Sequence, residues 1–151
     1  MRLTLGFVAL VSLSFLAAAP AAAQPLTIGV RAGASVDPDQ FYFGGHVETP
    51  PLVDRIHFRP NVEIGVGDDT TLVAFNFDLA YKFPGNRNRH WTPYAFGGPA
   101  LNIINAHDDT DAGGGFNFGL GIEHRQGLFG EIKVGVIDSP NFKIGIGYRF
   151  R

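Results

Sequence analysis

Apolar and polar side chains alternate along most of the chain after residue 24, and short clusters of turn-forming residues interrupt the alternation. Successive side chains of an extended strand point to opposite faces, so this pattern predicts strands with one apolar and one polar face. The last eleven residues show it most clearly. Their apolar positions are Phe142, Ile144, Ile146, Tyr148 and Phe150, and the positions between them hold only glycine, lysine and arginine.

Eight such stretches can be counted, each long enough to be a strand of a small barrel. They cover residues 26–35, 41–48, 55–66, 73–83, 91–105, 116–125, 128–137 and 142–150. The fifth stretch contains Pro93, Pro99 and the Gly97-Gly98 pair, which blur its register, so its facing is left unassigned. The pattern predicts an all-β fold, namely an eight-stranded antiparallel up-and-down barrel.

The glycines indicate which face of the barrel points inward. Gly29, Gly65, Gly119 and Gly147 all share a face with charged residues. A water-facing surface gains nothing from missing side chains, whereas the lumen of an eight-stranded barrel has little room. We therefore expect a transmembrane barrel with apolar side chains toward lipid. A soluble lipocalin-like periplasmic binding protein, with the two faces exchanged, is the alternative.

Aromatic residues give a second indication of a membrane. If the mature amino terminus lies in the periplasm, six aromatic residues gather at the periplasmic ends of their strands, as in an aromatic girdle. They are Tyr81, Phe83, Trp91, Tyr94, Tyr148 and Phe150.

The first 23 residues read as a cleaved signal peptide. A positive start is followed by an apolar run and by Ala21-Ala22-Ala23, a small-residue cleavage site. Residues 24–151 then form one outer-membrane β-barrel domain. The chain has no cysteine for disulfides, and its formal net charge of −2 with no basic run gives no footprint for nucleic-acid binding.

The mature sequence resembles the small outer-membrane β-barrel family of OmpA/OmpX type, also described as porin-like outer-membrane β-barrel domains. The resemblance rests on the signal peptide, on residues 59–65 and 93–98, and on the aromatic terminal strand. It implies the Gram-negative outer membrane as the location. It also implies recognition of the closing strand by the outer-membrane assembly machinery, although Phe150 is followed here by Arg151.

The charged residues on the inward face form the main chemical feature of the sequence. Thirteen of them are expected to make a lumenal charge network that fills the barrel, because pairing charges costs far less than leaving them unpaired. The set comprises Arg31, Glu48, Arg55, Arg59, Glu63, Asp78, Lys82, Glu123, Arg125, Glu131, Lys133, Lys143 and Arg149.

No catalytic, cofactor or metal site is predicted. The longest turn, residues 106–114, carries Asp108, Asp109 and Asp111, but their spacing matches no complete calcium loop. The mature chain holds only Ser35 and Ser139 as serines, and it lacks the His-x-Ser pairing used by lipid A deacylase barrels, so we do not expect an enzyme.

We expect a structural or envelope-associated role, with outer-membrane lipid and, during biogenesis, the assembly machinery as partners, and with a monomer as the folded form. A narrow porin-like channel for ions or small solutes is the first alternative function, although a barrel of this strand number favours a filled lumen over a conducting one.

Overall fold

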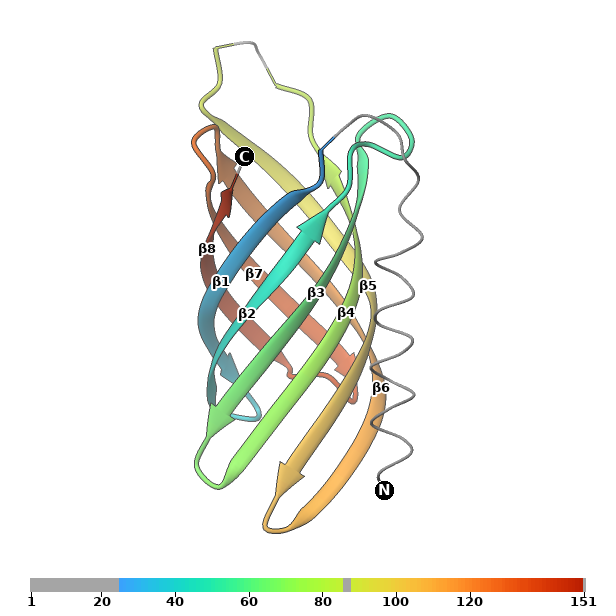
Figure 1. Cartoon of the computed structure of the whole chain (residues 1–151), viewed down its shortest axis with the longest axis vertical. Coiled ribbons are helices and arrows are strands. Elements are labelled where there is room, and N and C mark those ends of the chain that lie inside the picture. Colours follow the sequence, from blue (N-terminus) through green and yellow to red (C-terminus); the bar gives the residue numbers. More distant parts are fainter. Residues whose placement is uncertain (1–24, 86–87, 151) are drawn as a thin grey trace.

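The structure is a computed structural model that describes residues 25–85 and 88–150. The predicted signal peptide lies outside these residues, as does Arg151. Within the two described ranges, no helix is long and apolar enough to cross a membrane. Eight strands follow one another (Figure 1): β1 (Thr27–Val36), β2 (Gln40–Glu48), β3 (Ile56–Gly67), β4 (Thr70–Lys82), β5 (Trp91–Ala106), β6 (Asp109–His124), β7 (Leu128–Ile137) and β8 (Phe142–Phe150).

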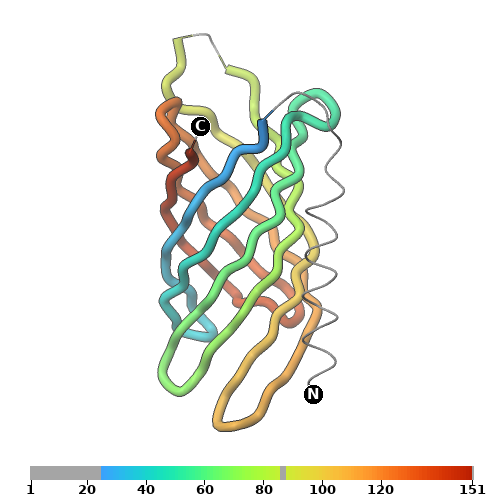
Figure 2. The backbone as a smooth tube through the Cα atoms, viewed as in Figure 1, coloured from blue at the N-terminus to red at the C-terminus, as the bar shows by residue number. Residues whose placement is uncertain are grey.

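The strands close into a single barrel in which every neighbouring pair is antiparallel. The closing seam joins β1 to β8, from Ile28 opposite Phe150 to Val36 opposite Phe142. All strands are inclined to the barrel axis, as Figure 2 shows. The predicted eight-stranded antiparallel up-and-down barrel is confirmed.

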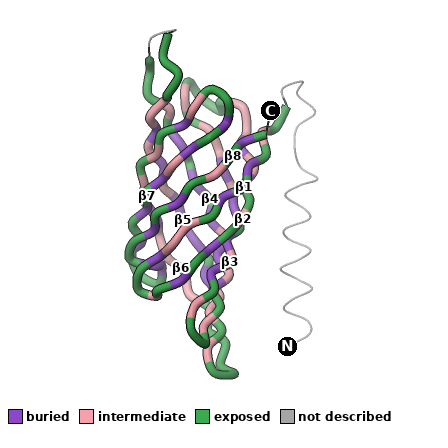
Figure 3. Tube along the Cα trace, turned by 90° about the vertical axis from the view of Figure 1, so that its left-hand side faces the viewer, coloured by how far each residue is buried: buried purple, intermediate pink, exposed green. Residues whose placement is uncertain are grey.

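The outer face of the barrel is apolar and the inner face is polar. Phe41 is 79% exposed and Ile146 66%, whereas Glu63 and Asp78 are 1% and 0% exposed. Buried and exposed positions alternate along the strands in Figure 3. A soluble barrel has the opposite arrangement, so the lipocalin-like alternative is wrong, and the apolar exterior fits the hydrocarbon of a bilayer.

The two ends of the barrel differ in their connections. One end, the terminal rim, holds the start of β1, the end of β8 and the connections 49–55, 83–90 and 125–127. The other end, the turn rim, holds the connections 37–39, 68–69, 107–108 and 138–141. The longest connections therefore lie on the side of the termini, whereas outer-membrane barrels usually have their short turns there.

The prediction of a long turn over residues 106–114 is wrong. Strand β5 continues to Ala106 and β6 begins at Asp109, so only His107 and Asp108 form the turn. Both have positive φ, 49° and 66°, which is the requirement of a two-residue hairpin turn that follows the twist of its strands. The β5–β6 hairpin consequently projects beyond its neighbours at the turn rim (Figure 1).

The structure also assigns the facing of the fifth strand. Tyr94, Phe96 and Asn102 of β5 are buried, whereas Trp91 and Leu101 are exposed on the outer face. Strict alternation along residues 128–137 would place Ile137 on the inward face, but its side chain is 81% exposed. Its φ of 66° breaks the extended conformation at the end of β7, so the alternation stops there.

Candidate functional site

Large inward side chains fit the narrow lumen because each lies against a glycine of the neighbouring strand. A Cβ atom at Gly119, for example, would lie 2.6 Å from Cε1 of Phe96. Missing side chains on one strand thus make room for rings on the next. The cross-strand pairs are Tyr42 with Gly33, His46 with Gly29, Tyr94 with Gly121, Phe96 with Gly119, and Phe129 with Gly147.

Glu63 of β3 is the first centre of the ion-pair network. Its carboxylate accepts hydrogen bonds from Lys143 Nζ at 2.5 Å, from Lys133 Nζ at 3.1 Å and from Arg31 Nη1 at 3.4 Å. These cations come from β8, β7 and β1, on the other side of the lumen. All four side chains are nearly inaccessible to solvent, so this cluster crosses the full width of the barrel.

Glu131 of β7 is the second centre, and Arg31 connects it to the first. Glu131 Oε2 lies 3.0 Å from Arg31 Nη1, and its Oε1 lies 2.7 Å from Arg59 Nη1. The Tyr94 hydroxyl donates to the same Oε1 at 2.7 Å. The Arg59 guanidinium also lies 4.7 Å from the centre of the Phe96 ring, a cation–π contact.

Four other charges, separate from the network around Glu63 and Glu131, form a second cluster nearer the terminal rim. Glu48 Oε1 accepts from Lys82 Nζ at 2.5 Å and from Arg149 Nη1 at 3.1 Å. Glu123 lies opposite and pairs with the same two cations, at 3.1 Å from Lys82 and 2.9 Å from Arg149. Each acid thus contacts both cations, so the four charges balance one another.

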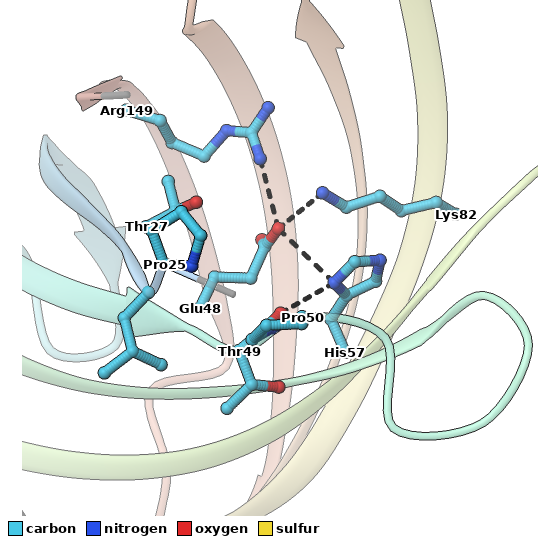
Figure 4. A pocket seen from close by; sticks show the side chains of 9 residues that line it. Pro25, Thr27, Glu48, Thr49, Pro50, His57, Lys82 and Arg149 are labelled. Atoms are coloured by element: carbon cyan, nitrogen blue, oxygen red, sulfur yellow. Dashed lines mark hydrogen bonds and ion pairs between the residues drawn. The ribbon is translucent and has the colours of Figure 1, made fainter. Parts of the chain in front are cut away.

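A cavity of about 480 Å³ opens beside this second cluster at the terminal rim. Pro25, Leu26 and Thr49 line it together with Glu48 and His57. Figure 4 shows the carboxylate of Glu48 in contact with Arg149, Lys82 and His57. His57 Nδ1 is 2.8 Å from the Thr49 carbonyl oxygen and 3.7 Å from Glu48 Oε1. The ion-paired side chains of Glu48, Lys82 and Arg149 form part of the cavity wall.

Amide side chains fill the space that the ions leave. Asn117 Nδ2 donates to Asn76 Oδ1 at 2.7 Å, and Asn76 Nδ2 donates to Asn61 Oδ1 at 2.8 Å. Asn61 in turn donates to Asp78 Oδ2 at 2.9 Å. These three asparagines lie on β6, β4 and β3, and only Asp78, at the end of this hydrogen-bonded chain, was predicted from the sequence as a residue of the lumen.

The connection between β7 and β8 folds inward at the turn rim. Ser139 is 7% exposed and Pro140 is buried, although both lie outside a strand. Asn102 Nδ2 holds the turn by donating to the Asp138 carbonyl oxygen at 2.5 Å and to Ser139 Oγ at 3.1 Å. Ser139 and Pro140 therefore lie inside the mouth of the barrel at this rim.

The predicted lumenal network lies inside the barrel except for two of its members. Arg55 comes before the first residue of β3, its side chain is 43% exposed, and its nearest acid is Asp54 at 4.0 Å. Arg125 is exposed in the connection between β6 and β7. Both assignments were wrong, because alternation was extended past the ends of the strands.

The predicted aromatic girdle also contains one wrong assignment. Tyr94 is 1% exposed and lies in the lumen, where its hydroxyl donates a hydrogen bond to Glu131. Trp91 fixes the outward face of β5, so Tyr94, three positions later, points inward. The other five residues lie near the terminal rim and are 37–53% exposed: Tyr81, Phe83, Trp91, Tyr148 and Phe150.

The residues considered for other chemistry have structural contacts. Ser35 Oγ donates to the Pro38 carbonyl oxygen at 2.9 Å, and Ser139 Oγ accepts from Asn102. Among residues 25–85 and 88–150, no three His, Cys, Asp or Glu side chains are grouped so that they could hold a metal ion.

Comparisons with known proteins give matches in structure. The sequence matches no protein-family model and no curated protein. The N-terminal β-barrel domain of Pseudomonas aeruginosa OprF matches with a TM-score of 0.61 and 17% identity, over 83% of this chain and 96% of that domain. Neisserial surface protein A (NspA) matches with a TM-score of 0.62 and 11% identity, over 82% and 94% of the two chains.

The outer membrane enzyme PagL has a similar structure too, with a TM-score of 0.54 and 9% identity, over 83% of this chain and 99% of PagL. At such identities the similarity concerns the fold, which can carry different functions. The apolar exterior, the polar lumen and these structural matches all indicate the same fold. The chain has the fold of the small outer-membrane β-barrel proteins.

Proposed function

We propose that the protein is an outer-membrane β-barrel with a structural, envelope-associated role and a lumen closed to ions. The observation that carries this proposal is the pair of acids Glu63 and Glu131, which together bind cations from β1, β3, β7 and β8 across the lumen. Moving an ion through this cluster requires separating buried charges from their partners, which is strongly unfavourable.

The inward-folded β7–β8 connection at the turn rim supports the same proposal. An ion that passed the charge network would still meet Ser139 and Pro140, which are buried in the mouth of the barrel. Small barrels of this strand number are filled by their own side chains, whereas water-filled pores have many more strands. The narrow-channel alternative is therefore disfavoured.

The proposed role is not catalytic. PagL demonstrates that an enzyme can have this fold. Here, however, the Ser35 hydroxyl donates a hydrogen bond to a backbone carbonyl oxygen, and the Ser139 hydroxyl accepts one from an amide side chain. Neither serine is therefore arranged as a nucleophile beside a general base. The proposed partners are lipid around the apolar exterior and, during biogenesis, the assembly machinery. The exposed Phe150 at the end of β8 suits recognition by that machinery.

Conductance across a planar bilayer tests the closed lumen. The refolded protein should insert without producing unitary current steps. A matched variant, Tyr94→Ala with Phe96→Ala, removes two rings beside Arg59 and should admit water and ions if it remains folded. Reproducible current steps from the unmodified protein would favour the narrow-channel alternative.

A further inference from the structure

Exposed charges of opposite sign lie at the two ends of the barrel. The connections of the terminal rim carry exposed Arg89 and Arg125 and partly exposed Arg55, with Asp54 as their exposed acid among the described residues. The turn rim carries exposed acids: Asp37, Asp39, Asp68, Asp69, Asp108, Asp109, Asp111 and Asp138. A membrane protein with this distribution presents a cationic end to one leaflet.

Five residues of the terminal rim form one local surface, the rim cluster: Arg89, His90, Trp91, His124 and Arg125. The Arg125 backbone N–H donates to the His90 carbonyl oxygen at 2.9 Å and so joins the β4–β5 and β6–β7 connections. The rings of His90 and His124 are stacked with centroids 6.1 Å apart, and Trp91 meets His124 edge-on at 4.7 Å. These contacts hold Arg125 beside His90, the residue that follows Arg89 in the chain, so both arginines lie on the same side of the rim.

The outward-facing Trp91 indicates that the rim cluster lies where a bilayer would change from hydrocarbon to headgroups. Trp91 is 41% exposed on the outer face, directly opposite His124 in the β5–β6 register. Tryptophan and tyrosine side chains of membrane proteins gather at this interface. Arginines just beyond such aromatic residues reach the phosphates of the lipid headgroups.

We propose that the rim cluster binds the headgroup phosphate of an anionic phospholipid in the leaflet at the terminal rim. This inference rests on the proposed membrane function. Arg89 and Arg125 supply charge and hydrogen-bond donors for phosphate, and the Trp91 indole lies against the glycerol region of the lipid. The rim cluster contains no acid that would neutralise its arginines.

Trp91 makes this proposal directly measurable, because it is the only tryptophan of the chain. The full mature chain is reconstituted in vesicles that contain phospholipids with brominated acyl chains, which quench tryptophan fluorescence on contact. Brominated phosphatidylglycerol is compared with brominated phosphatidylcholine at equal mole fractions. We expect the site to bind the anionic lipid more tightly than phosphatidylcholine, by up to about fivefold for each arginine at low salt. This difference in affinity should fall at high salt.

Two variants test whether the preference for the anionic lipid arises at the rim cluster. Arg89→Gln with Arg125→Gln should abolish it while leaving quenching by phosphatidylcholine unchanged. Arg55→Gln is the matched control, because Arg55 lies at the same rim but on the β2–β3 connection, outside the rim cluster. The control should keep the preference of the unmodified protein.

The possible failures are distinguishable. Equal quenching by both lipids, or a preference that survives the double substitution, would overturn the proposed headgroup site and leave the membrane barrel intact. Absence of quenching by either lipid would mean that Trp91 does not contact a bilayer, which would overturn both the site and the proposed membrane function.

Discussion

At the scale of single residues, Glu63 shows how one buried acid holds several cations of the lumen together. One carboxylate, 1% exposed, serves Arg31, Lys133 and Lys143. A buried charge whose partner is removed is destabilising, because the remaining charges keep the cost of their desolvation. Any change that neutralises Glu63 therefore leaves three buried cations with too little negative charge.

We expect Glu63→Gln to lower the free energy of unfolding by about 3–5 kcal/mol. Urea unfolding of the barrel in lipid vesicles measures this change. Asp108→Asn is the control, because that acid is exposed in the β5–β6 turn and should leave the unfolding curve in place. A loss below about 1 kcal/mol for Glu63→Gln would be typical of an exposed ion pair and would indicate a wet lumen.

Sequence reasoning predicted residues well where strand alternation was strict. Arg31 and Lys143 lie inside the barrel as expected. Tyr94 was assigned to the rim because aromatic residues are common there, although the opposite facing of Trp91 would have placed it inside. The prediction that Arg55 and Arg125 lie in the lumen was wrong for a different reason, because alternation does not reveal where a strand ends.

At the scale of secondary structure, β8 shows how one strand serves two environments. Lys143 and Arg149 reach acids inside the lumen, while Ile146 between them is exposed on the outer face. The strand was predicted correctly because its alternation is uninterrupted. The inward fold of the β7–β8 connection was not predictable, since it depends on the contact of Ser139 with Asn102 of the distant strand β5.

We expect Ile146→Arg to cost about 2–4 kcal/mol of folding free energy, because Ile146 lies midway along β8 and the charge would enter the hydrocarbon. Phe142→Arg is the matched control on the same face at the end of the strand, where the cost should be about 0–1 kcal/mol. Unfolding titrations in vesicles compare the two. Equal costs would show that the outer face of β8 is not in a bilayer.

At the scale of the whole molecule, closure of the barrel determines its resistance to unfolding. The β1–β8 seam pairs both ends of the described chain, and every strand has two hydrogen-bonded neighbours. The closed architecture was predictable from strand number and length. The rim that holds the longest connections was not predictable. Turn-forming residues suggested a long turn over 106–114, but they do not show how far β5 and β6 extend into it.

The folded protein should resist SDS at room temperature and unfold when boiled, since a closed sheet satisfies its backbone donors internally. Unboiled and boiled samples should therefore migrate differently on a gel. Identical migration of a refolded sample that shows strand structure by circular dichroism would be inconsistent with a closed barrel.

The placement of each large lumenal ring against a glycine has a consequence for how this sequence can diverge. A methyl group at Gly121 would meet the Tyr94 ring, which supplies the three atoms nearest to it, whereas a smaller residue at position 94 alone would leave a void. A single substitution at either position should therefore be destabilising, whereas a compensated change at both can be neutral. Variation among descendants of this gene should therefore be coupled across neighbouring strands inside the barrel, while lipid-facing positions drift one at a time.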